Sequence, residues 1–159
     1  VMGLFLDGRV MIGHVGDSRC YRLRTGSFVQ ITRDHSWLQE QIDAGLLTPQ
    51  QAQNSEYGNL VTRALGVETS VQIEFNEFPV EPQDLYILCS DGLTDMIGDG
   101  DLAALATAPA PLTEKAARMI QLANAMGGRD NISVVLVQAA GEKHRHIKPS
   151  LVSRLLRSH

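Results

Sequence analysis

The sequence has little cysteine and lacks any hydrophobic run long enough to cross a membrane. Its two cysteines, Cys20 and Cys89, both fall in apolar, strand-like stretches, so we expect buried thiols in a reducing compartment and no disulfide. No apolar stretch approaches the roughly 18–20 residues of a membrane-spanning helix, and no secretory signal opens the chain. These absences predict a cytoplasmic location and no integral membrane segment.

The sequence also lacks an excess of positive charge. Its 14 Lys and Arg residues against 18 Asp and Glu residues give a formal net charge of −4, and only 5% of the residues are aromatic. Such a chain has no general attraction for nucleic acid or acidic lipid, and it shows no basic stripe with interleaved aromatic residues. We therefore exclude nucleic acid as a partner. With 159 residues, 43% of them hydrophobic, the chain can bury a core of its own.

The two ends differ from the body of the chain. The sequence opens inside an apparent strand, Val1 to Leu6, and we expect it to be a piece of a longer protein because natural domains avoid an unpaired first edge. Residues 141–159 are expected to form a basic amphipathic tail. Such a tail can contact an anionic membrane or a partner, or it can pack on its own domain.

Hydrophobic periodicity predicts an α+β chain without internal repeats. The opening section alternates with Asp-Gly and Thr-Gly turns and is expected to be an antiparallel meander. Residues 36–66 read as a largely helical excursion from the sheet, with Ser36 as a helix cap. Later strands are expected at Val71–Phe75, Leu85–Cys89 and Ile132–Val137. A short helix through Leu102, Leu105 and Ala106 is expected with Asp99 or Asp101 as its cap, and a longer one at Leu112–Met126.

Three aspartates lie on turns at the ends of strands. Asp91 follows the apolar strand Leu85–Cys89, and Asp130 precedes the strand Ile132–Val137. If these two strands, which both look fully buried, are antiparallel neighbours, their carboxylates converge, and converging carboxylates repel one another unless a cation or proton lies between them. Asp17 ends an earlier strand beside Gly16. Taken singly, each aspartate reads as a turn residue; together they favour a hard divalent cation.

Five sequence blocks, in order, resemble the PP2C family of metal-dependent Ser/Thr protein phosphatases, in particular its bacterial branch. The resemblance covers about Val1 to Val137 and leaves only the tail outside. A lone Ser-Asp-Gly would carry no weight, but five ordered blocks are specific. The blocks are HVGDSR (14–19), ITRDHS (31–36), NLVTRALG (59–66), CSDGLTD (89–95) and GGRDNIS (127–133).

The resemblance implies a fold and a domain organisation. The fold would be part of a PP2C-like α-β-β-α sandwich, in which two antiparallel sheets carry helices outside. Residues 1–140 would form the C-terminal portion of the phosphatase domain, with 36–66 as a flap-like insertion beside the site and 141–159 as the tail. His35, as a lone histidine, is expected to be a hydrogen-bonded packing residue and not a metal ligand.

The resemblance also implies the chemistry. Asp91 would ligate one ion of a binuclear Mn²⁺ or Mg²⁺ centre and Asp130 the other, while Asp17, with Asp91, would hold a weaker third ion found in bacterial members. A metal-activated water would hydrolyse phosphoserine and phosphothreonine in proteins, so no cysteine nucleophile is needed. The implied partners are phosphorylated proteins and a cognate Ser/Thr kinase with its targets.

The sequence departs from the family pattern because the first half of the domain is absent. That half supplies an Asp near the N-terminus, a metal-bridging Asp-Gly pair and, in many members, an Arg that grips phosphate. We therefore expect residues 1–159 alone to bind metal poorly and to turn over slowly or not at all.

Two other functions remain to be weighed against this one. A catalytically inactive phosphatase-like scaffold, or phosphoprotein-binding module, is the first, although such a domain has no reason to keep carboxylates clustered. A calcium-binding protein is the second, prompted by Asp91, Asp95, Asp99 and Asp101. This spacing lacks the third-position oxygen ligand and the closing Glu of an EF-hand loop. Asp95 and Asp99 read more simply as helix-capping and turn residues.

Overall fold

The computed structural model describes residues 1–140 apart from 54, 56, 58–59 and 68. Strands and helices alternate in blocks, as expected for an α+β chain. In chain order, the elements are β1 (Met2–Leu6), β2 (Arg9–His14), β3 (Arg19–Arg24), β4 (Ser27–Gln30), α1 (Trp37–Asp43), α2 (Pro49–Gln53), β5 (Glu74–Pro79), β6 (Leu85–Cys89), α3 (Asp91–Thr94), α4 (Asp99–Thr107), α5 (Leu112–Ala125) and β7 (Val134–Gln138).

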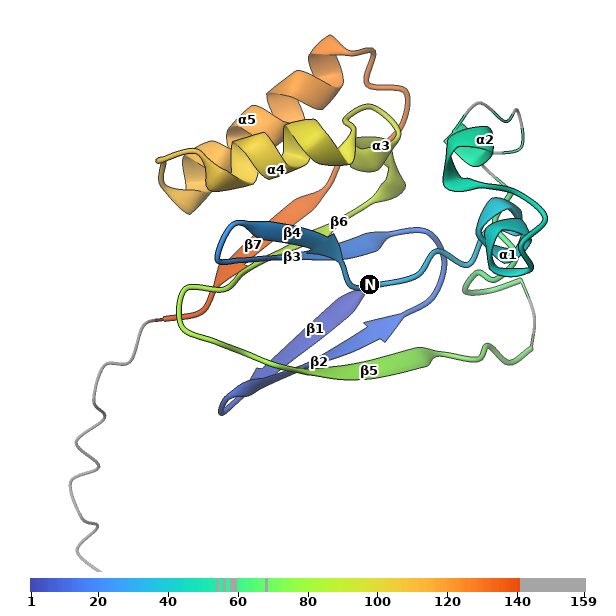
Figure 1. Ribbon diagram of the computed structural model, residues 1–159, viewed down its shortest axis with the longest axis horizontal. Helices are drawn as coiled ribbons and strands as arrows, with labels where there is room; N and C mark the ends of the chain where they lie inside the picture. The colour runs from blue at the N-terminus through green and yellow to red at the C-terminus, as the bar shows by residue number, and fades with distance from the viewer. Residues whose placement is uncertain (54, 56, 58–59, 68, 141–159) are drawn as a thin grey trace, which may run out of the picture.

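The strands form two antiparallel sheets stacked face to face (Figure 1). One sheet has three strands in the order β1-β2-β5, and the other has four in the order β4-β3-β6-β7. Hairpins join β1 to β2 and β3 to β4. The single meander expected for the opening section is wrong, because β2 and β3 lie in different sheets and the section forms two separate hairpins. Strand β3 also pairs with β6, and β6 pairs with β7, both antiparallel. The last two pairings connect segments that are far apart in sequence.

Strand β6 divides the core into two layers because its successive side chains point to opposite faces of the sheet. Tyr86 packs between the two sheets with Val10, Ile12 and Cys20. The side chains of Leu85, Ile87 and Cys89 face the other way, into a cluster that the helices complete. The helical members of that buried cluster are Leu93, Ile97, Leu102, Ala106, Met119 and Ala123.

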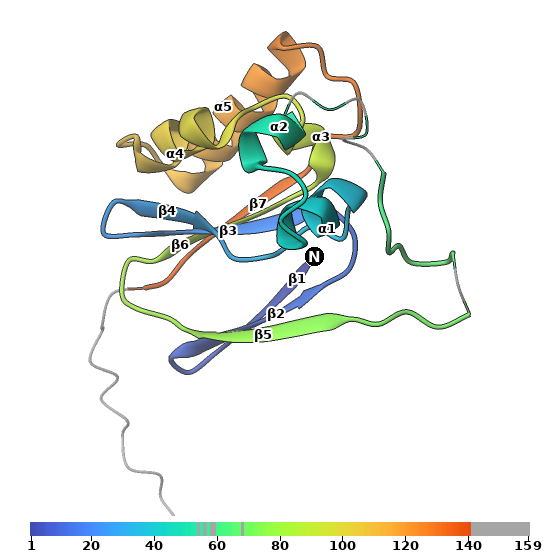
Figure 2. The same cartoon turned by 45° about the vertical axis from the view of Figure 1, so that its right-hand side comes forward.

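Helices cover only one side of the sandwich in the described part of the chain. Helices α3, α4 and α5 lie over the four-stranded sheet, whereas α1 and α2 lie to the side, near the connection from β2 to β3 (Figures 1 and 2). The outer face of the three-stranded sheet carries large apolar side chains that are 37–60% exposed. They are Met2, Leu4, Leu6, Met11 and Phe75.

Two strand predictions need correction. The strand expected at Val71–Phe75 is instead β5, Glu74–Pro79, and its inward side chains are Glu74, Asn76 and Phe78 rather than the apolar residues of the expected strand. Phe78 packs against the inter-sheet core, and this contact fixes the register. Strand β7 is not fully buried, because it forms one edge of its sheet and leaves Val135 58% exposed.

The helix predictions agree better with the structure. Helix α5 ends one residue before the expected end, and Ser36 caps α1 by accepting a hydrogen bond from the Gln39 backbone N–H. Helix α4 covers the expected segment, but the cap prediction was wrong: Gly98 occupies the cap position, and Asp99 and Asp101 lie in the first turn. Short helix α3 was not predicted. None of the described helices has the length and apolar character needed to span a bilayer. The predicted tail, 141–159, lies outside the described residues.

Candidate metal centre

Asp91 and Asp130 lie at the same end of the β6–β7 pair. Asp91 is the first residue of α3, directly beyond β6, and Asp130 lies four residues before β7. The antiparallel register pairs Cys89 with Val134, which brings the two flanking segments together. Ser90 fastens them: its backbone N–H donates to the Ser133 carbonyl (3.1 Å), and its hydroxyl donates to the Asn131 carbonyl (2.8 Å).

Gly92 allows the two aspartate-bearing segments to touch. A Cβ atom placed on Gly92 would lie 2.5 Å from the Asn131 carbonyl oxygen and 3.3 Å from the Asp130 carbonyl carbon. Real Cβ atoms essentially never approach a neighbour that closely. The Gly after Asp91 is therefore required by the contact between the segments and not only by a turn.

Asp17 approaches the same place from the β2–β3 connection. Gly16 has φ +99°, a conformation that other L-residues rarely adopt, and it turns the chain between the two sheets. The Asp17 side chain lies close enough to Asp91 to feel its negative charge. Burial first, and then the negative charge of Asp91, raise the pKa of Asp17. The structure thus brings Asp17 to Asp91.

Asp95 is a further member of this group that sequence reasoning assigned to capping and turns. It follows the last residue of α3, and its backbone N–H donates to the Asp91 carbonyl at 2.8 Å. Burial first, then the charges of Asp91, Asp17 and Asp130, raise the pKa of Asp95, whereas Arg19 lowers it. The spacing of four residues from Asp91 was the available signal, because it places both side chains on one face of a helical turn.

The cation that acts on both Asp17 and Asp95, Arg19, is engaged in other contacts. Arg19 forms a bidentate ion pair with Asp34, with 2.6 Å between Nη2 and Oδ2, and its Nη1 donates to the Tyr21 hydroxyl. The Tyr21 hydroxyl in turn donates to Asp99 at 2.9 Å. Arg19 therefore gives the aspartate group only partial compensation. Asp99 is occupied by this hydrogen bond, as expected for a structural residue outside the group.

The cysteines are buried, as predicted. Cys20 is 0% and Cys89 3% exposed, and both are free. Burial raises the pKa of Cys20 to about 12 and that of Cys89 to about 11, so both are neutral thiols at physiological pH. A protonated thiol is a poor nucleophile. Neither cysteine is suited to attack phosphorus.

The side-chain chemistry of Asp17, Asp91, Asp95 and Asp130 suits a hard divalent cation, but among the described residues no three of these carboxylates bring their oxygens within 4.8 Å of one another. All four offer carboxylate oxygens, the ligands that Mg²⁺ and Mn²⁺ prefer. Burial first, and then the negative charge of Asp91, raise the pKa values of Asp17 and Asp95, and a bound dication would offset both effects. The chemistry of the residues therefore agrees with a metal site at this end of the four-stranded sheet.

Comparison with known proteins connects the chain to bacterial Ser/Thr phosphatases. The Listeria innocua Ser/Thr phosphatase stp is 38% identical over 138 residues, which cover 87% of this chain and 55% of that protein. The crystal structure of the Mycobacterium tuberculosis Ser/Thr phosphatase PstP/Ppp matches with a TM-score of 0.82 and 36% identity, over 88% of this chain and 58% of that one.

The crystal structure of the catalytic domain of a Ser/Thr protein phosphatase PstP, in complex with two manganese ions, matches with a TM-score of 0.77 and 36% identity, over 88% of this chain and 57% of that chain. No protein-family model matches the sequence. The chain spans about half the length of the curated Listeria and Streptococcus relatives it matches.

Proposed function

We propose that this chain, a member of the PP2C family of Ser/Thr protein phosphatases, supplies one wall of a metal-dependent site that hydrolyses phosphoserine and phosphothreonine in proteins. The observation that carries the proposal is the gathering of Asp17, Asp91, Asp95 and Asp130 from three separate segments. Similarity to named bacterial Ser/Thr phosphatases over 83–93% of the chain supports it.

In this proposal Asp91 holds one ion of a Mn²⁺ or Mg²⁺ pair and Asp130 the other. Asp17, with Asp91, holds a third and weaker ion, and Asp95 adds negative charge beside them. The ions, when bound, would lower the pKa of a water molecule and neutralise phosphoryl oxygens. The protein's own part is to hold mutually repelling carboxylates at fixed positions, through the Ser90 hydrogen bonds and the close approach at Gly92.

The described carboxylates do not account for the whole site. Two or three dications need more ligands than four aspartates that each contribute one or two oxygens. The chain also spans about half the length of the relatives it matches. We therefore propose that full metal binding and turnover need the upstream half of the phosphatase domain, and that residues 1–140 are its C-terminal portion with 36–66 as a flap-like insertion.

The proposed partners follow from the reaction. Phosphorylated proteins are the substrates, and a Ser/Thr kinase with shared targets is the expected counterpart. A cytoplasmic location agrees with the two free, buried thiols. A catalytically inactive scaffold is not favoured, because burying Asp17 and Asp95 beside the negative charge of Asp91 costs stability without serving a scaffold.

The experiment is Mn²⁺-dependent dephosphorylation of a phosphothreonine peptide. It compares this chain with a chain extended upstream, in the presence of Mn²⁺ and of EDTA. We expect turnover from the extended protein alone, abolished by EDTA. Enzyme-like turnover by residues 1–159 would contradict the need for an upstream half, and no turnover by either chain would contradict the proposed function.

Asp91→Asn tests the aspartate group directly. In the extended protein it should lower turnover by at least about a hundredfold, because the loss of a direct metal ligand should exceed the 10–100-fold effects of second-shell changes. Asp7→Asn is the matched control, since Asp7 is an exposed residue of the β1–β2 turn. Equal losses in both variants would show that the effect is not specific to the group.

A further inference from the structure

His35 joins the Asp17 turn to the segment that begins α1. Its backbone N–H donates to the Gly16 carbonyl at 2.9 Å, and the Gly16 backbone N–H donates back to His35 Nδ1 at 3.1 Å. The His35 carbonyl accepts a hydrogen bond from the Thr62 backbone N–H at 2.8 Å. His35, which is buried with 8% of its surface exposed, therefore binds both the turn before Asp17 and the part of segment 36–66 near Thr62. The predicted hydrogen-bonded role of His35 is confirmed.

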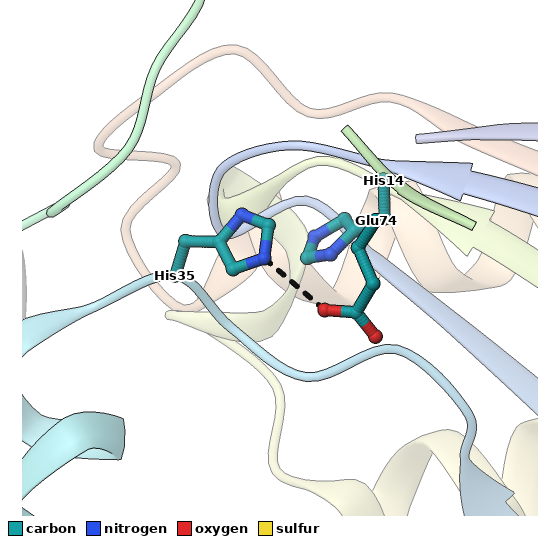
Figure 3. A group of neighbouring side chains, drawn as sticks. All are labelled: His14, His35 and Glu74. Atoms are coloured by element: carbon teal, nitrogen blue, oxygen red, sulfur yellow. Dashed lines mark hydrogen bonds and ion pairs between the residues drawn. The ribbon is translucent and has the colours of Figure 1, made fainter. Parts of the chain in front are cut away.

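The hydrogen bond from Gly16 fixes the tautomer of His35. Because Nδ1 accepts a proton donor, the ring proton of the neutral imidazole lies on Nε2. That nitrogen faces Glu74 Oε2 at 3.2 Å and donates to it (Figure 3). Arg63 Nη1 lies at the same distance from Nε2, but it has the Gln72 carbonyl as its acceptor. Burial raises the pKa of Glu74, but hydrogen bonds from Asn76 and His35 outweigh burial, and the net shift is downward. Glu74 is thus a charged acceptor that orients the His35 ring.

His14 forms a wall on one side of this arrangement. Its ring lies 4.7 Å from the ring of His35 between centroids, with the planes tilted by 34°, and it is 2% exposed (Figure 3). Neither ring nitrogen has a hydrogen-bond partner within the described structure. Burial, and then the neighbouring His35, lower the pKa of His14, which favours a neutral packing ring.

The same three side chains could be read as a metal site, since His14, His35 and Glu74 each offer a ligand atom within 4.8 Å of the others. Two contacts argue against this. Both nitrogens of His35 are engaged, and ligation through Nε2 would move the proton to Nδ1, where it would face the Gly16 N–H. In addition, Nη1 of Arg63 lies 3.2 Å from Nε2, and its positive charge opposes a dication.

We propose that His35 and Glu74 are positioning residues that couple the flap-like segment 36–66 to the Asp17 turn. Glu74 orients the His35 ring, His35 holds Gly16, and Gly16 sets the direction in which Asp17 leaves β2. Movement of the segment at Thr62 is thereby transmitted to the aspartate group. This inference rests on the proposed function only for its consequence, the affinity for metal; the coupling itself is a property of the fold.

Two substitutions of His35 separate its side-chain hydrogen bonds. The amide oxygen of His35→Asn can occupy the position of Nδ1 and accept from Gly16, but it cannot reach Glu74. The amide of His35→Gln reaches the position of Nε2 and Glu74, but it offers nothing to Gly16. His14→Phe is the control, because it keeps a ring against His35 and removes no hydrogen bond.

The first measurement is amide hydrogen exchange of the ¹⁵N-labelled chain, together with the ¹⁵N signals of the His35 ring. We expect a proton on Nε2 and none on Nδ1. Exchange of the Gly16 amide should accelerate on the order of fivefold or more in His35→Gln, and much less in His35→Asn or His14→Phe. Thr62 should accelerate together with Gly16 if the two ends are coupled. Unchanged exchange at Gly16 in folded His35→Gln, verified by circular dichroism, would overturn the proposal.

The second measurement is Mn²⁺ binding, read from the decrease of the free-ion electron paramagnetic resonance signal. His35→Gln should weaken binding severalfold, while His14→Phe should leave it unchanged. If the wild-type protein binds no Mn²⁺, even when extended upstream, the proposed function fails, whereas the Gly16 exchange data still decide the coupling. Zn²⁺ is then added in the presence of excess Mg²⁺. If the proton on His35 Nε2 is lost, His14, His35 and Glu74 form a metal site, and the proposal is overturned.

Discussion

Replacement of Gly92 by alanine should both destabilise the chain and disturb the aspartate group. The added Cβ atom would lie 2.5 Å from the Asn131 carbonyl oxygen and 3.0 Å from its carbonyl carbon. Ordinary van der Waals contact begins at 3.4 Å, so these atoms must separate by about 0.9 Å. The obstacle is backbone, which cannot swing aside as a long side chain can.

The expected magnitude follows from this overlap. Forcing one extra carbon into a packed interior costs about 1–3 kcal/mol. For a chain of this length, each kcal/mol lowers the melting temperature by roughly 2–4 °C, which gives a decrease of roughly 2–12 °C. The displacement moves the Asp130 segment away from Asp91. Metal affinity should therefore fall by more than the loss of stability alone explains.

Thermal unfolding in EDTA and Mn²⁺ binding of the folded variant test the two effects separately. Gly100→Ala is the matched control, because Gly100 lies in α4 and a Cβ there would meet nothing within 4 Å. Alanine in a helix is preferred over glycine by about 0.5–1 kcal/mol, so this control should melt at a slightly higher temperature. If Gly92→Ala melted and bound metal like the wild type, the argument from close approach would be refuted.

Three further predictions concern charged groups. Arg24→Met removes the ion pair with Asp84, whose side chain is 1% exposed; at pH 7 we expect a loss of roughly 2–4 kcal/mol by urea unfolding. Burial raises the pKa of Asp84, but hydrogen bonds from Arg24, the Glu81 N–H and Tyr86, together with the charge of Arg24, lower it overall. The loss should therefore shrink as the pH falls below about 4, whereas Arg9→Met, at an exposed pair, should change little. The pKa of Asp17 is raised, so its charge opposes folding above that pKa. Asp17→Asn should therefore raise the melting temperature in EDTA at pH 7 and give no benefit near pH 4. A stabilisation that grew as the pH was lowered would contradict this reasoning. Asp130→Asn in the upstream-extended protein should abolish Mn²⁺-dependent turnover yet melt in EDTA no lower than the wild type, and severe unfolding would show a structural role instead.

Much of the fold could be predicted because local signals and tertiary packing agree. The apolar run Leu85–Cys89 is a central strand whose two faces both meet core residues, so its pattern alone identified it. Helix α5 has a single buried stripe that includes Met119 and Ala123, and its bounds followed from periodicity. The meeting of Asp91 and Asp130 needed only the correct pairing of β6 with β7.

The errors arose where tertiary contacts override local pattern. The alternation around Val71–Phe75 suggested apolar side chains facing inward, but Phe75 is 59% exposed and Glu74 faces inward because His35 and Asn76 donate to it. Strand β7 was predicted to be buried because its residues are apolar. Its exposure follows from its position at the edge of the sheet, which depends on the order of the strands and not on the local sequence. Asp95 was missed because its neighbours Asp17 and Asp130 are distant in sequence.

The order β4-β3-β6-β7 has a consequence for folding and for ion binding together. The four aspartates come from the β2–β3 turn, from α3 and from the approach to β7, so no short stretch of the chain can gather them before the central pairings exist. A cluster of ions that draws its ligands from all three segments can bind only the assembled state, and by mass action it stabilises that state. The fraction of molecules with the four-stranded sheet assembled should therefore increase with the ion concentration. A titration with Mn²⁺ then also measures how much of the protein is in the native state.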